Sequence, residues 1–193
     1  MSAAGRITTG FSLPYVALYA ASGGTITYTS GQKLARGVDV TISPESSDDN
    51  IFYADNVAAE NEAGRFTGGT VSLTVDGLLP ATKKLIFGLP TSTGGWTAYG
   101  DDMAVPYVGI GYIARVQSDG VVAYVPTVLA KCRFSLPEDA AATQEESIDW
   151  QTQSLEATIM RADDANHVWK FEGDEETTEA AAEAALKTKL GIS

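Results

Sequence analysis

Alternation of apolar and polar residues is clearest in the segment 107–134. Its first half carries apolar side chains at every second position: Val108, Ile110, Tyr112, Ala114 and Val116. A period of two predicts a strand that directs one face to a core. Ser118, Asp119 and Gly120 interrupt the pattern, and an Asp-Gly pair tolerates the positive φ angles of a tight hairpin turn. The pattern therefore predicts a long antiparallel hairpin at the centre of the fold.

The return strand of this hairpin continues the alternation, with one face formed by Val128, Ala130, Cys132, Phe134 and Leu136. Pro126 lies in its middle, and because proline cannot donate to a ladder, we expect an edge, a bulge or a break there. On the outgoing strand, Gly109 and Gly111 favour curvature or the close approach of another backbone.

Shorter β patterns flank the hairpin. We expect strands over residues 15–20, 25–29, 34–42, 71–75 and 167–171, and an extended or irregular lead-in over residues 1–14. Two more alternations, over residues 148–150 and 155–159, have opposite parity, which predicts a bulge or a change of side near Gln153. Residues 138–146 are acidic and rich in alanine, and they form either a loop or a brief helix.

Two segments carry helical signals. Pro80 suits the first turn of a short helix, and Gly88 can close it. Residues 175–190 begin with glutamates and end with lysines, which complements the helix dipole, and Gly191 is a typical residue after a helix end. We therefore expect a mainly β fold, a β-sandwich or curled antiparallel sheet with one short flanking helix and a C-terminal helix within residues 174–191. The length predicts a single domain over residues 1–193.

Residues 43–67 depart from these patterns. They combine a proline and many acidic residues with an apolar patch, Ile51 to Tyr53. We expect a long connection without regular structure of its own, and such connections are usually functional or disordered. It is either a mobile acidic loop or an arm that orders against another subunit, and the embedded apolar residues favour the arm. The candidate interface residues are Asp48, Asp49, Ile51, Phe52, Tyr53, Asp55, Glu60, Glu62 and Arg65.

The net charge of −12 and the pI of about 4.4 change the functional picture. An acidic protein lacks the lysines and arginines that grip phosphates, although nucleic acid can still slide past such a surface. Cys132 is the only cysteine, which excludes an internal disulfide and favours a reducing, intracellular place of assembly. We expect a soluble chain, because no segment reads as a signal peptide or a membrane span.

Residues suited to catalysis are scarce. His167 is the only histidine, so one cysteine and one histidine cannot fill a zinc site. The G-I-G sequence at 109–111 lies within a strand pattern and does not open a helix, as a dinucleotide fingerprint would. Paired carboxylates such as Asp163 and Asp164 are typical of solvated loops. We expect no enzymatic activity, no cofactor and no metal, and instead a binding or assembly module.

Several longer strings resemble a known family. These are YADN (53–56), PYVGIGY (106–112), PTVLAKCRFS (126–135) and TQEESIDWQT (143–152). Together with the order of elements from about Leu34 onward, they resemble the major tail proteins of bacteriophages with long, non-contractile tails. Residues 1–30 add little to the resemblance.

The resemblance implies a structural virion protein of the phage tail tube. Family members form hexameric rings of β-sandwich subunits, and the rings stack into a β-lined tube through which DNA leaves without specific binding. The long loop between early strands reaches the neighbouring ring, which assigns that role here to residues 43–67. The implied partners are further copies of this chain, the tape measure protein, the tail terminator and the distal tail or initiator proteins, with no membrane. The implied location is the virion tail, assembled in the cytoplasm of the host bacterium.

An acidic lumen would repel phosphates and let DNA slide. Asp39 and Asp76 are the lumen-facing candidates, because both have outward parity on predicted strands.

Two other classes stay open. One is a tube or ring protein of a contractile tail or a secretion system, which shares the fold. The other is a carbohydrate-binding or hydrolytic β-sandwich, in which aromatic side chains would form a sugar platform: Trp96, Tyr99, Trp150 and Trp169.

Overall fold

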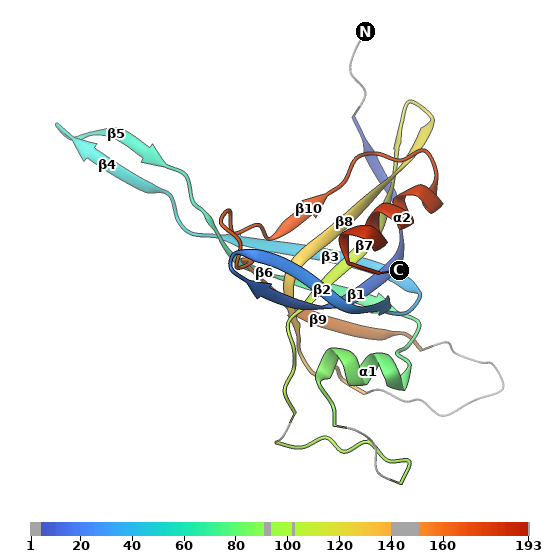
Figure 1. The fold of residues 1–193 in the computed structure, drawn as a ribbon. Helices are drawn as coiled ribbons and strands as arrows, with labels where there is room; N and C mark the ends of the chain where they lie inside the picture. Colours follow the sequence, from blue (N-terminus) through green and yellow to red (C-terminus); the bar gives the residue numbers. More distant parts are fainter. Residues whose placement is uncertain (1–4, 91–93, 102, 140–150, 193) are drawn as a thin grey trace.

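The computed structural model describes residues 5–90, 94–101, 103–139 and 151–192, and it confirms a mainly β fold with 54% strand and 11% helix. The described elements are β1 (Ile7–Ser22), β2 (Thr25–Lys33), β3 (Gly37–Ser46), β4 (Asn50–Ala54), β5 (Val57–Glu62), β6 (Phe66–Val75), α1 (Pro80–Phe87), β7 (Val108–Ser118), β8 (Val121–Phe134), β9 (Gln153–Met160), β10 (Lys170–Glu172) and α2 (Glu179–Lys189). Figure 1 shows one curled sheet, helix α2 on its outer face, helix α1 at one end of the curl and a long hairpin that projects away from the sheet.

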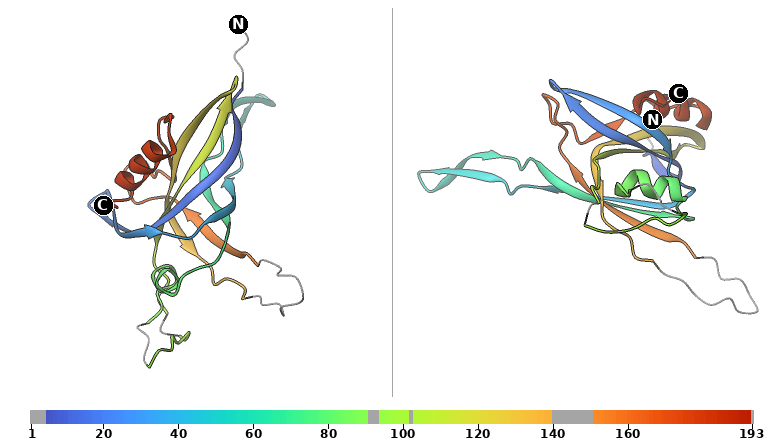
Figure 2. Two further views of the ribbon diagram at one scale, coloured as in Figure 1. Left: turned by 90° about the vertical axis from the view of Figure 1, so that its right-hand side faces the viewer. Right: turned by 60° about the horizontal axis from the view of Figure 1, so that its bottom comes forward.

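The main sheet has eight strands, and all its pairings are antiparallel. The order is β2-β1-β7-β8-β9-β6-β3, and β10 pairs with the middle of β8. The sheet curls so that its end strand β3 approaches β1 (Figure 2). A backbone hydrogen bond from Leu34 N–H to Pro14 O, at 2.8 Å, fastens the start of this approach.

The main core fills the inside of the curl. Its fully buried residues come from five strands and from α1, and they include Val16, Leu73, Ile86, Phe87, Ile110, Leu129, Leu155 and Ile159. The inward parity predicted for residues 71–75 is confirmed, because Val71, Leu73 and Val75 are all buried. Helix α1 closes one end of the curl. It begins at Pro80 and ends before Gly88, whose φ of 60° is the left-handed cap predicted from sequence.

A second, smaller core lies on the outer face of the sheet under α2. Ala182, Leu186 and Leu190 are completely buried against Ile113 of β7 and Val128 of β8. Helix α2 begins after Thr178, whose side chain accepts a hydrogen bond from Ala181 N–H, and it ends before Gly191 with its φ of 62°. The central hairpin is thus covered on both faces, which explains why both parities of β8 are buried at its middle.

The two glycines of β7 make room for side chains. A Cβ on Gly109 would stand 2.4 Å from the ring of Tyr28, and one on Gly111 would stand 2.7 Å from Leu186. The sequence predicted curvature or the approach of another backbone, whereas the groups that approach both glycines are side chains. Gly111 lets α2 pack directly on the sheet.

Several predicted boundaries were wrong. β2 continues to Lys33, β3 begins at Gly37 and β6 begins at Phe66, against predicted strands over residues 25–29, 34–42 and 71–75. The irregular lead-in is part of β1, which runs from Ile7 through two irregularities of register on either side of Ser12 and has a positive φ at Leu13. The last strand occupies Lys170–Glu172 instead of residues 167–171, and His167 has a φ of 52° before it. The terminal helix begins at Glu179, because residues just before it still contact the sheet through a bridge between Tyr124 and Glu176.

The expected edge, bulge or break at Pro126 is not observed. β8 is continuous, and Pro126 pairs in register with Ile113 of β7. In a strand the N–H and C=O of a residue point to the same side. The carbonyl of Pro126 accepts from Gly173 N–H just beyond β10, so the missing N–H lies where the β10 ladder ends. The expected loop or helix at 138–146 and the strand at 148–150 fall mostly outside the described residues.

Cys132 is completely buried in the main core. Burial raises the pKa of its thiol, because a thiolate would be poorly solvated there. We expect the native protein not to react with a thiol reagent at neutral pH, and to show one reactive thiol in denaturant. Rapid reaction without denaturant would contradict this placement.

Candidate assembly surfaces

The segment 43–67 is a hairpin and not an irregular loop, which corrects the expectation of a connection without regular structure. Strands β3 and β6 extend toward it, and β4 pairs with β5 to form a separate two-stranded sheet. Asp55 and Asn56 form the turn with φ angles of 52° and 65°, as the two central residues of a type I′ turn require. We call β4, this turn and β5 the arm. Figures 1 and 2 show that it points away from the body.

Hydrogen bonds fasten the base of the arm. The carboxylate of Asp49 accepts from Gly64 N–H at 2.9 Å, and Ser47 Oγ accepts from Arg65 N–H at 3.0 Å. A Cβ on Gly64 would stand 1.8 Å from the carbonyl oxygen of Ser47, so only glycine fits there. These contacts give the base of the arm a defined geometry, although the ladder of β3 with β6 does not continue into the ladder of β4 with β5.

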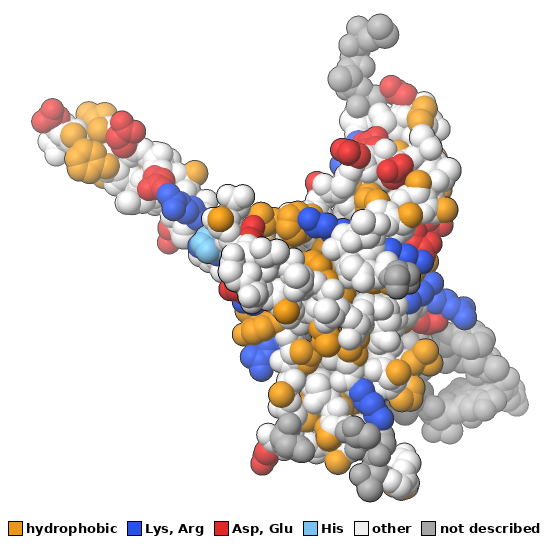
Figure 3. All heavy atoms as spheres, in the orientation of Figure 1, with side chains coloured by type: hydrophobic (Ala, Val, Ile, Leu, Met, Phe, Trp, Pro, Cys, Tyr) orange, Lys and Arg blue, Asp and Glu red, His pale blue; other side chains and the backbone are white. Residues whose placement is uncertain are grey.

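The tip of the arm is apolar and exposed. Every residue of β4 and β5 is exposed, including Phe52 and Tyr53 at 63% each. Figure 3 shows hydrophobic side chains gathered at the tip with acidic groups beside them. Of the nine predicted interface residues, eight lie on the arm or are hydrogen-bonded at its base: Asp49, Ile51, Phe52, Tyr53, Asp55, Glu60, Glu62 and Arg65. Arg65 pairs with Glu62 in an exposed ion pair, and Asp48 lies just before β4.

The two predicted lumen residues lie close to the ends of β3 and β6. Asp39 is exposed on β3 and borders a groove described below. Asp76 follows β6, accepts a hydrogen bond from Arg36 N–H at 2.9 Å and forms an exposed ion pair with the Arg36 side chain. Asp76 therefore fastens the start of β3 to the end of β6, a local role that sequence parity does not indicate.

A groove of about 470 Å³ opens at the end of the curl that α1 does not close. Its apolar lining comes from four strands: Phe11, Val38, Val40, Ile42, Tyr112, Ala114, Val116 and Val125. Charged residues border it, namely Arg6, Asp39, Lys170 and Glu172. Sequence reasoning did not find this groove, because the approach of β3 to β1 that forms its walls is a tertiary feature.

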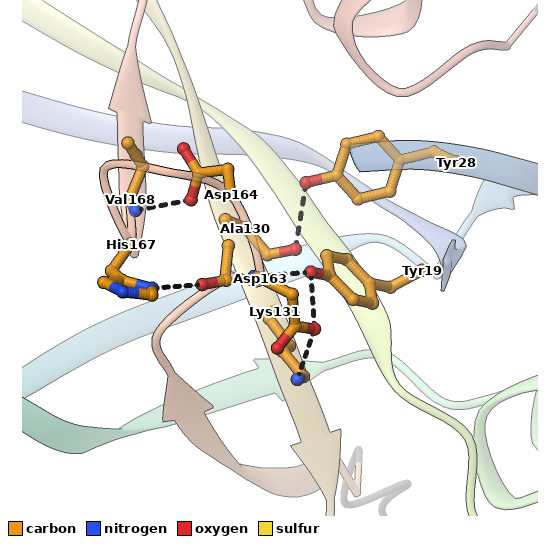
Figure 4. Close-up of polar contacts among 9 residues, drawn as sticks. Tyr19, Tyr28, Ala130, Lys131, Asp163, Asp164, His167 and Val168 are labelled. Atoms are coloured by element: carbon orange, nitrogen blue, oxygen red, sulfur yellow. Dashed lines mark hydrogen bonds and ion pairs between the residues drawn. The ribbon is translucent and has the colours of Figure 1, made fainter. Parts of the chain in front are cut away.

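A polar cluster fastens β1 and β8 to the turn after β9 (Figure 4). Asp163 Oδ2 accepts from Lys131 Nζ at 2.7 Å and from the Tyr19 hydroxyl at 2.9 Å, and that hydroxyl accepts from Asp163 N–H at 2.9 Å. Burial raises the pKa of Tyr19, which keeps its hydroxyl protonated as a donor. The hydrogen bonds from Lys131 and Tyr19 lower the pKa of Asp163. All three side chains are engaged with one another, which indicates a structural cluster.

This cluster predicts a pH dependence. A carboxyl whose pKa is lower in the folded state stabilises the fold above its unfolded pKa, and that contribution is lost as the pH falls toward the folded pKa. We expect Asp163→Asn to be less stable than the unchanged protein at neutral pH, and the difference to shrink below about pH 4. Urea unfolding at several pH values measures this difference. A deficit that stays constant into acid would show that the charge of Asp163 is not responsible.

One of the four aromatics expected to form a sugar platform is engaged in packing. Trp169 stacks on Phe66 with ring centroids 4.6 Å apart and packs against the main core. Trp96 is 83% exposed and Tyr99 56%, and Trp150 is outside the described residues.

The described residues lack a metal-binding cluster and a helix that could span a membrane. No group of three or more His, Cys, Asp or Glu side chains in them is arranged to hold a metal ion. None of their helices has the length and apolar character needed to cross a membrane.

Comparison with known proteins adds no relative. No protein-family model matches this chain. The search of curated proteins likewise gave no significant match.

Proposed function

We propose that this protein is a structural subunit of a bacteriophage tail tube, assembling with further copies of itself into stacked rings. The observation that carries the proposal is the arm: a hairpin with a fixed base that carries exposed aromatic side chains away from the body. Exposed apolar clusters of this kind mark contact sites. The resemblance of the quoted sequence strings to tail tube proteins supplies the kind of assembly.

The sheet itself supports assembly. β2 and β3 are its two end strands, and each has a single partner strand in the described chain. Unpaired edges invite pairing with another chain, and soluble proteins either protect such edges or use them. Repetition of one edge-to-edge contact around a closed ring would satisfy all of them.

The negative net charge of the chain suits the wall of a channel through which DNA passes. A net charge of −12 disfavours adhesion of DNA, and carboxylates along an inner surface would repel phosphates during passage. Asp39 remains our lumen candidate because it is exposed on a strand, whereas Asp76 is engaged with Arg36. Initiator, tape measure and terminator proteins would then set where the tube starts and ends.

Electron microscopy of the purified protein at rising concentration, with light scattering alongside, tests the proposal. We expect hollow rings or tubes of uniform width. Particles that stay monomeric even after addition of a tail-tip initiator would count against it. Because a tube of a contractile tail or a secretion system has the same fold, the decisive extra observation is whether a sheath protein co-assembles around the tube.

A further inference from the structure

We propose that the groove at the open end of the curl is the receptor for the arm tip of a second copy of this chain. This assignment rests on the proposed assembly role and names the surface that would receive the arm. Two apolar surfaces that the chain itself leaves uncovered carry it: the tip, with Phe52 and Tyr53, and the groove, with exposed Val38 and partly buried Ala114 on its walls.

The groove is apolar because it continues the main core. Val108 and Ile110 of β7 are completely buried inside the curl, whereas Ala114 on the same face of the strand is only partly buried and lines the groove beside the buried Val116. Val38 on the opposite wall is 58% exposed, against the sequence expectation of an inward residue. A hydrophobic insert would therefore complete the interior of the sheet at this end and remove apolar area from water.

The arm tip fits this site by size and chemistry. A cavity of about 470 Å³ can take large side chains, and aromatic anchors seated in pockets dominate many interfaces. Asp55 at the turn adds a carboxylate beside the aromatics. Arg6 and Lys170 border the groove, where they pair with Glu175 and Glu172 at 2.6 Å each. An incoming Asp55 could share these cations at the rim.

The occupant must come from another molecule, because the arm points away from the body that carries it (Figures 1 and 2). A contact between two different surfaces leaves one tip and one groove free on every pair. Such heterologous contacts propagate from copy to copy and do not stop at a dimer. The tip-to-groove contact therefore builds either a closed ring or an open stack, according to the rotation between successive copies.

Cysteine cross-linking tests the pairing directly. Cys132 is buried, so introduced surface cysteines are the accessible thiols. The arm position is Val57→Cys, which keeps Phe52 and Tyr53 in place, and the groove position is Val38→Cys. The control is Leu79→Cys, which is exposed at 71% just before α1 and does not line the groove. Each arm variant is mixed with one body variant and oxidised at a concentration series.

We expect a disulfide-linked dimer from Val57→Cys with Val38→Cys, at about tenfold or more the yield of the control mixture. Preferential linkage to Leu79→Cys, or no linkage to either position, would overturn the groove assignment. A chain carrying both Val57→Cys and Val38→Cys that closes on itself at low concentration would overturn the second-copy occupant. Microscopy of the same samples separates the two proposals. A disulfide-linked dimer without tubes would support the groove assignment and count against the tail-tube proposal. Tubes without the disulfide would support the tail-tube proposal and count against the groove assignment.

A non-covalent variant gives an independent readout. Val38→Asp places a carboxylate at the groove wall on an already exposed residue, so the fold should persist. We expect the concentration needed for assembly to rise by about tenfold or more, and Leu79→Asp to leave it unchanged. Equal effects of both substitutions would contradict a specific site in the groove.

Discussion

Replacing residues 48–63 by an Asn-Gly turn should give a folded protein that no longer assembles into tubes. The replaced residues form the arm and its immediate base, and all of β4 and β5 is exposed, so the core loses nothing. The chain ends left behind lie side by side. Ser47 N–H bonds to Arg65 O at 2.9 Å, and the carbonyl of Ser47 lies close to Gly64. A two-residue type I′ turn suits ends that are held at this spacing.

The expected loss of assembly is complete, because the deletion removes the whole apolar tip. Negative-stain microscopy measures assembly, and urea unfolding measures the fold, whose free energy of unfolding should change by no more than about 1 kcal/mol. The matched control is Phe52→Ser with Tyr53→Ser, which keeps the hairpin and removes only its two aromatics. Tubes of normal width from the shortened chain would show that the arm is dispensable.

Features with a local physical cause could be predicted from the sequence. The Asp119-Gly120 turn has φ angles of 48° and 82°, as the hairpin pattern indicated, and the ends of α1 follow from Pro80 and Gly88. The apolar parity of residues 71–75 is likewise a consequence of one buried face.

Prediction from sequence was wrong where solvent exposure or irregular strand pairing hides the alternation of apolar and polar residues. The arm has no buried face, so its strands lack alternation, and only the Asp55-Asn56 pair within YADN signalled its turn. In β1, irregular pairing on both sides of Ser12 breaks the strand pattern.

The candidate sites likewise divide into those that the sequence could predict and those that depend on the tertiary fold. An acidic segment with embedded aromatics was predicted from the sequence as a contact surface, and the structure shows that these aromatics are exposed. The groove was not, because Phe11 and Val38 meet only after the sheet curls. The cluster of Tyr19, Lys131 and Asp163 joins Tyr19 to residues more than a hundred positions further along the chain, so no local spacing in the sequence predicts it.

Leu186→Ala should be the most destabilising single substitution considered for the body. Leu186 is completely buried between α2 and the sheet, where its side chain lies against the position of Gly111. Truncation removes apolar contacts and leaves a cavity, since Gly111 offers no side chain to fill it. Comparable substitutions cost about 2–5 kcal/mol. Urea unfolding should show a lower midpoint with an unchanged slope.

A matched control on the same helix is Thr188→Ala, because Thr188 is exposed and bonds only to the helix carbonyl of Ala184. We expect that change to stay within about 0.5 kcal/mol. If α2 were a loosely attached tail, both substitutions would give the same small effect. A large loss confined to Leu186 would instead establish α2 as a fixed outer layer of the sheet. It would then hold β7 and β8 in the shape that forms one wall of the groove, so loss of α2 packing should also weaken tip docking.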